Sequence, residues 1–175
     1  MRYLRTPVAV ALMAFGLFAC GSGPRVVYID ASWTRLYHDI PSLRADADIA
    51  VSGKVLRSSA VVETPPATDF TFLVDAVLHA RAGLPIAAPT TIVVHQSGGI
   101  QNGQMYEVSD DPPFQIGEID VLFLHQYAPG RFFVLGGPSG RFLIGSDGMV
   151  RPVNIEGVAL QPTPKDAFFK EIRTT

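Results

Sequence analysis

The fold is decided by Ile119-Asp120-Val121-Leu122-Phe123-Leu124-His125-Gln126-Tyr127, residues 119–127 of this chain. Residues 121–124 at its centre are all apolar, and successive side chains of a strand point to opposite faces. Both faces of this strand would therefore be apolar, which is typical of a strand that is covered on both sides. The sequence predicts one central, buried strand with shorter strands around it.

Further strands are expected on either side of the central one. Before it, residues 49–56 form a first strand, with Gly53 at a bulge or a close backbone approach. Residues 69–79 alternate along a second strand, and residues 90–96 form a third. After it, three more short strands are expected at residues 131–135, 140–144 and 149–151.

Glycine-containing turns separate these strands. Asn102-Gly103 is a strong signal for a two-residue hairpin, and Asp147-Gly148 is a second one. The segment 136–141 is rich in glycine, but it lacks the spacing and the Lys-Ser/Thr pair of a phosphate-binding loop. We therefore expect a turn between two strands there.

Helical periodicity is confined to the two ends of the mature chain. Trp33, Leu36, Tyr37 and Ile40 share one helical face, which predicts a helix capped by Ser32. Pro41 would close this helix, with residues 41–47 adding at most one more turn. Residues 165–172 favour a short C-terminal helix. Trp33 and Tyr37 either pack this first helix onto the domain or form a pair that stacks on a ligand.

Together these patterns predict a mainly β fold. The chain of 175 residues is 47% hydrophobic, enough for a core, and 16 Gly with 14 Pro provide many turns. A flat sheet of short strands would leave open edges, which closure into a barrel removes. We expect a small closed or partly closed OB-like β-barrel of about five to seven strands.

Several segments in order resemble a widespread family of secreted bacterial proteins with an OB-like or TIMP-like barrel. They are Ala47–Val55, Ser97–Gly99, Pro113–Glu118, Leu122–Leu124 and Gly136–Phe142. The resemblance covers about residues 47–150. It implies the barrel fold and brings no catalytic residue with it.

The N-terminus carries the most specific motif. Arg2 and Arg5 precede the uncharged run 8–19, which has the length of a secretory signal and is too short to span a membrane. The run ends in Leu17-Phe18-Ala19-Cys20, which resembles the lipobox of bacterial lipoproteins. That resemblance implies cleavage before Cys20, the only cysteine, and a diacylglycerol thioether on its sulfur. The other interpretation is an ordinary signal peptide cut after Ala19.

This motif divides the chain and predicts its location. We expect a signal peptide at 1–19, a lipidated tether and short helix at 20–47, a barrel domain at 48–155 and a C-terminal tail at 156–175. The lipid on Cys20 would anchor the protein in the cell envelope. Because Gly21 is not Asp, the lipobox resemblance implies the outer membrane, facing the periplasm, if the cell is Gram-negative. A net charge of −2 argues against nucleic acid as a partner.

The search for catalytic or metal-binding motifs finds none. His79, His95 and His125 each fall near the end of an expected strand, so a three-strand metal site is conceivable, yet no two are close in sequence. Ser97, His95 and Asp75 form the best available nucleophile trio, without a recognisable motif around the serine. We therefore predict no cofactor, no metal and no enzymatic activity.

The leading hypothesis is a binding module for an envelope protein or glycan. The loops 64–68 and 100–113 would supply its binding surface. One alternative is a protease inhibitor of the TIMP-like barrel type, although that mechanism needs the free amine of an N-terminal Cys, which acylation of Cys20 would block. A hydrolase is the third reading.

Overall fold

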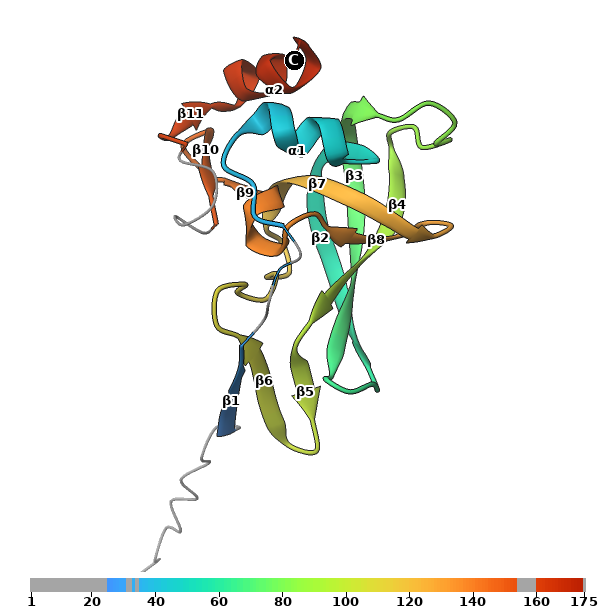
Figure 1. The fold of residues 1–175 in the computed structure, drawn as a ribbon, viewed down its shortest axis with the longest axis vertical. Helices are drawn as coiled ribbons and strands as arrows, with labels where there is room; N and C mark the ends of the chain where they lie inside the picture. The colour runs from blue at the N-terminus through green and yellow to red at the C-terminus, as the bar shows by residue number, and fades with distance from the viewer. Residues whose placement is uncertain (1–24, 31–32, 34, 154–159, 175) are drawn as a thin grey trace, which may run out of the picture.

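The computed structural model describes residues 25–30, 33, 35–153 and 160–174. Within them, five strands close into a barrel in the order β7–β2–β3–β4–β8 and back to β7 (Figure 1). All neighbours in this ring are antiparallel except β4 and β8, which are parallel. The predicted closed OB-like barrel is confirmed. Its strands are β2 (Ile49–Val61), β3 (Ala67–Ala80), β4 (Thr90–Ser97), β7 (Ile119–Ala128) and β8 (Arg131–Val134).

Shorter strands extend the barrel on the far side of β7. They are β9 (Arg141–Ile144), β10 (Met149–Pro152) and β11 (Thr163–Pro164), and the sheet runs β7–β9–β10–β11. A separate three-stranded ribbon consists of β1 (Arg25–Ile29), β6 (Gln104–Val108) and β5 (Gly99–Gln101). Strand β1 was not predicted and lies in the segment that we expected to hold only the tether and a helix. Its run of Val, Val, Tyr and Ile has the composition of a strand.

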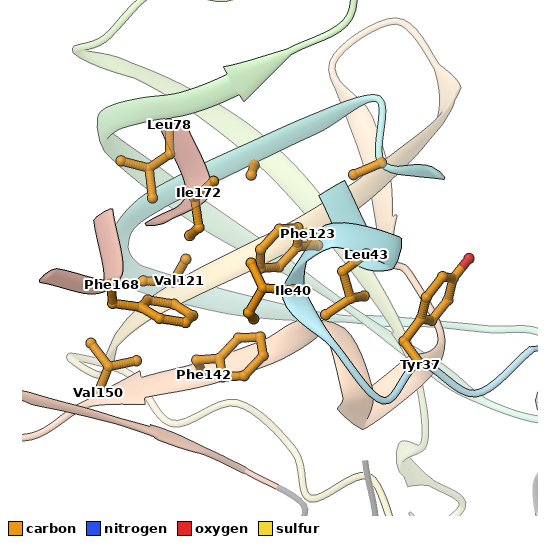
Figure 2. Close-up of a cluster of buried hydrophobic side chains, with 12 residues drawn as sticks. Tyr37, Ile40, Leu43, Leu78, Val121, Phe123, Phe142, Val150, Phe168 and Ile172 are labelled. Atoms are coloured by element: carbon orange, nitrogen blue, oxygen red, sulfur yellow. The ribbon is translucent and has the colours of Figure 1, made fainter. Parts of the chain in front are cut away.

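The central strand β7 is buried as the sequence predicted. Residues 120–124 are all buried, because β7 pairs with β2, β8 and β9 and both of its faces are covered. Among the described residues, one apolar cluster fills the barrel, and its members include Phe72, Leu122 and Phe132. The other lies between the barrel wall and the helices, where Phe123 and Phe142 meet Phe168 (Figure 2).

The N-terminal helix does not lie where we predicted it. Helix α1 spans Ile40–Asp46, and neither Trp33 nor residues 35–39 are helical. Asp39 is its N-cap, accepting a hydrogen bond of 2.7 Å from the backbone N–H of Ser42. Pro41 occupies the first turn, where its missing N–H costs nothing, so it starts the helix rather than closing it. The expected cap, Ser32, falls outside the described residues.

The other predicted elements are confirmed with small changes of boundary. Helix α2 spans Lys165–Thr174 and buries Phe168 and Ile172 against the barrel (Figure 2). A 3₁₀ turn, η1 (Gly137–Gly140), joins β8 to β9, as expected of that glycine-rich segment. Gly53 lies at a register shift of β2, and a Cβ there would be only 1.9 Å from the carbonyl oxygen of Leu73.

The two predicted hairpin turns differ in type. Asn102 and Gly103 both have positive φ, at 52° and 74°, which is the type I′ geometry between β5 and β6. Gly148 also has a positive φ of 74°, but Asp147 does not. The connection from β9 to β10 is therefore a longer turn, closed by the Gly148 N–H donating to the Gly145 carbonyl at 2.9 Å.

Candidate functional site

Two neighbouring pockets form one groove across the outside of the barrel. The larger holds about 450 Å³ and the smaller about 240 Å³. They share Trp33, Phe133, Val134 and Gly137, so they adjoin along β8. We call this feature the groove. Its remaining lining residues are Arg35, Tyr37, His125, Leu135 and Gly136 in the larger pocket, and His95, Gln96, Ser97 and Asp111 in the smaller.

Two aromatic rings at the wall of the groove pack directly against the backbone of two glycines. A Cβ on Gly137 would lie 2.5 Å from the indole ring of Trp33, and one on Gly136 would lie 2.6 Å from the ring of Tyr37. Both glycines also have positive φ, at 55° and 65°. No other residue type combines this backbone geometry with this close approach. The Trp33 indole N–H donates a hydrogen bond of 2.7 Å to Asp110, which holds the ring from its other end.

Strand register brings four side chains into one row across the barrel. Asp69 of β3 pairs with His95 of β4, His95 with Phe133 of β8, and Phe133 with His125 of β7. Paired positions point to the same face of a sheet. The row therefore places two histidines on either side of Phe133, on the floor of the groove.

Each of these histidines meets a carboxylate through Nδ1. His125 Nδ1 lies 2.8 Å from Asp48, which is also paired with Arg81 at 2.7 Å. His95 Nδ1 lies 2.8 Å from Asp69. Burial disfavours the charged form of Asp69, but hydrogen bonds from His95 and Arg131 outweigh it, so the pKa of this carboxyl stays below its ordinary value. These bonds fix the orientation of both rings.

The arrangement around His95 is poor for general-base catalysis. Its second ring nitrogen, Nε2, lies 3.1 Å from a carboxylate oxygen of Glu63. Both ring nitrogens of His95 thus already face carboxylate oxygens, so neither is free to take a proton from a serine without losing that contact. Ser97 lines the same pocket, but the third member of the predicted trio does not: Asp75 is exposed further along β3, and Asp69 occupies its expected role.

The three-histidine metal hypothesis finds only two of its members together. His95 and His125 both line the groove. His79 lies near the C-terminal end of β3, where it pairs with Ala50 of β2. Burial, together with the positive charges of Arg44 and Arg81, lowers the pKa of His79. Within the described part of the chain, no three His, Cys, Asp or Glu side chains converge in a way that could hold a metal ion.

A buried cation fixes the loop that borders the groove. Arg141 is 2% exposed and bonds to Glu118 at 2.9 Å, to Asp120 at 3.4 Å and to the carbonyl of Pro112 at 2.6 Å. Its guanidinium also stacks 3.8 Å from the ring centre of Phe114. This cluster clamps the loop that carries Asp110 and Asp111. Sequence reasoning missed it, because an Arg after a glycine-rich turn gives no sign that it is buried.

The loops predicted to form a binding surface enclose a second cleft of about 330 Å³. It is lined by Thr68 and Phe70 from one side and by Ile100, Met105 and Pro113 from the other. The Thr68 hydroxyl donates to the Gly98 carbonyl at 2.9 Å, which ties the first loop to the junction of β4 and β5. The predicted lipidation site, Cys20, and the signal segment 1–19 lie outside the described residues.

Comparison with known proteins adds no family to this picture: neither the protein-family models nor the curated proteins contain a match to the chain. Among the described helices, none combines the length and the apolar character needed to cross a bilayer. The case for function therefore comes from the site and the sequence.

Proposed function

We propose that this protein is a lipid-anchored protein of the cell envelope and a non-enzymatic binding module that takes a segment of a partner protein into the groove. The lipobox-like motif at Cys20 supports the anchor. The groove supports the binding role, and the observation that carries it is that its two pockets adjoin and share Trp33 and Phe133 as lining residues.

The lining of the groove suits an extended peptide with an apolar anchor residue. Phe133 is 39% exposed on the floor and stacks on the exposed ring of Tyr127, and adjoining exposed apolar side chains mark interaction surfaces. Trp33 lines the wall beside it, whereas Tyr37, at 4% exposed, supports the wall from the core; aromatic side chains provide much of the binding energy of protein interfaces. The larger pocket is lined mainly by apolar side chains and glycines, which suits an apolar peptide side chain better than the hydroxyl groups of a sugar.

A hydrolytic role is the weaker alternative. Ser97 and the His95–Asp69 pair share a pocket, which is the observation in its favour. Against it, Glu63 engages the nitrogen of His95 that a serine would need. Inhibition of a protease through the N-terminal residue stays an alternative only if Cys20 carries a free amine.

The only tryptophan of the chain, Trp33, is a native reporter for the groove. The mature lipoprotein in detergent micelles, with Cys20 at its N-terminus, is used to capture partners from envelope extracts. Each captured protein is then titrated while the emission of Trp33 is followed. We expect saturable changes in emission that are lost in Phe133→Ala.

The matched control is Ile116→Ala, which removes an exposed apolar side chain outside the groove. It should bind like the wild type. Equal capture by Phe133→Ala and wild type would refute the groove as the binding site. Saturation of Trp33 emission by soluble peptidoglycan fragments instead would assign the groove to a glycan, and turnover of ester or peptide substrates that is lost in His95→Ala would assign it to a hydrolase.

A further inference from the structure

The ribbon β1–β6–β5 carries an exposed row of apolar side chains. Its register places Val26 of β1 opposite Met105 of β6, and Met105 opposite Ile100 of β5. Val26 is 41% exposed and Ile100 is 58% exposed. The three side chains lie on one face of the ribbon, since paired positions point the same way.

More apolar surface surrounds this row at the same end of the molecule. Tyr28, two residues beyond Val26 on the same face, is 68% exposed. The β2–β3 turn adds Val62, and Ile116 lines the second cleft together with Ile100. Figure 1 shows the ribbon and the β2–β3 turn projecting together away from the helices. We call this surface the apolar end; it comprises Val26, Tyr28, Val62, Ile100 and Ile116.

The chain between the anchor and the ribbon is short. Arg25, the first residue of β1, is five positions after Cys20, and a fully extended chain spans at most about 3.6 Å per residue, or roughly 18 Å here. A lipid on Cys20 would therefore hold the ribbon close to the headgroups. Such a short tether converts a weak contact into an intramolecular one with a high effective concentration.

We propose that the apolar end rests in the interface of the phospholipid bilayer, with the ribbon as its deepest part; this inference rests on the proposed lipid anchor at Cys20. Tyr28 has the amphipathic ring that favours the membrane interface, and the carboxylate of Glu107, its partner in β6, marks the polar edge of the apolar row. None of the five residues of the apolar end lines the groove. Membrane contact and partner binding thus use separate surfaces.

The experiment measures how deeply the ribbon enters a bilayer. The mature, lipidated chain is reconstituted into phosphatidylcholine vesicles with and without acyl-brominated lipid, which quenches nearby tryptophan. Trp33→Phe removes the native reporter, and Tyr28→Trp places a new one on the ribbon. Tyr127→Trp is the matched control, because Tyr127 is also exposed, at 46%, but lies on the barrel flank.

We expect brominated lipid to quench about half of the emission at position 28 and about a tenth or less at position 127, because interfacial segments lie only about 5–10 Å deep. Ile100→Trp repeats the measurement from another strand should Tyr28→Trp fold poorly. Adding Val26→Asp should reduce quenching at position 28 while the protein still floats with the vesicles.

The outcomes separate this inference from the anchor on which it rests. Tyr28→Trp and Ile100→Trp proteins that float with the vesicles but show no quenching overturn the membrane contact alone. Wild-type protein that does not float overturns the anchor and the contact with it. If the tryptophan emission of Tyr28→Trp shifts to shorter wavelength in the absence of vesicles, and the protein has a dimeric mass, the apolar end binds a second copy of the chain instead.

Discussion

The ring of Trp33 lies directly against the backbone of Gly137, so closely that a Cβ on that glycine would be 2.5 Å from two atoms of the indole. This contact joins a residue that precedes the barrel to the turn between β8 and β9. It builds one wall of the groove, and it explains why the turn contains glycine where the ring crosses it.

Gly137→Ala should therefore destabilise the protein and displace Trp33. The matched control is Gly130→Ala, because Gly130 also has a positive φ, 70° against 55°, but has no atom within 4 Å of the new Cβ. Both substitutions place alanine at a positive φ, so the difference between their unfolding free energies measures the clash with Trp33. We expect Gly137→Ala to cost about 1 to 3 kcal/mol more in urea unfolding, as overpacked sites do. Equal costs with unchanged Trp33 emission would contradict the contact.

Phe123→Ala should produce a large loss of stability. Phe123 is fully buried in the central strand and packs edge-on against Phe142 at 5.9 Å. Truncation of such a side chain costs about 3 to 5 kcal/mol. Phe133→Ala, on the adjacent strand and 39% exposed, is the control and should cost much less. A loss below about 1 kcal/mol in Phe123→Ala, measured by denaturant unfolding, would mean that the strand is not central.

The contribution of Asp120 to stability should fall as pH rises from about 4 to 7. Burial, reinforced by the neighbouring Glu118 and opposed by Arg141, raises the pKa of Asp120 from 3.8 to about 7. Between these values the folded state keeps a proton that the unfolded chain releases, so the stabilisation present below pH 4 is lost as pH passes 7. Burial raises the pKa of Asp111 as well, which acts in the same direction.

Comparison with Asp120→Asn isolates this carboxyl. The difference in unfolding free energy between wild type and Asp120→Asn should change by up to about 4 kcal/mol between pH 4 and 7 and stay level above. Asp147→Asn is the control: hydrogen bonds from Arg151 and from the backbone of Met149 lower the pKa of Asp147 to about 2, so its curve should run parallel to that of the wild type above pH 5. Parallel curves for both variants would contradict the shift at Asp120.

Cys20→Ala should abolish lipidation and leave the signal segment uncleaved by the lipoprotein peptidase. The sulfur of Cys20 is the only thiol in the chain, so no other residue can form the thioether. Intact mass spectrometry of the membrane fraction measures the acyl groups directly. A wild-type protein without lipid, or a Cys20→Ala variant that stays in the membrane fraction with an added acyl mass, would show that the motif is misread.

Much of the fold could be predicted from the sequence because its signals are local. Four consecutive apolar residues at 121–124 require cover on both faces of β7, and Asn102-Gly103 can form a type I′ turn through its own φ preferences. The helix near Pro41 shows the limit of such signals. Residues from Trp33 to Ile40 have helical spacing, yet the helix begins only at Ile40. The rings of Trp33 and Tyr37 pack instead against the backbone of Gly137 and Gly136.

The sequence by itself determined the barrel class, its turns and the expected anchor at Cys20, because alternation, glycine placement and a contiguous motif are properties of neighbouring residues. Only the tertiary structure decided the candidate site. The row from Asp69 through His95 and Phe133 to His125 arises from register between strands that are far apart in the chain. Arg141 likewise finds Glu118 and Asp120 only when the barrel closes. Such pairings depend on which strands become neighbours, and the strands become neighbours only when the barrel closes.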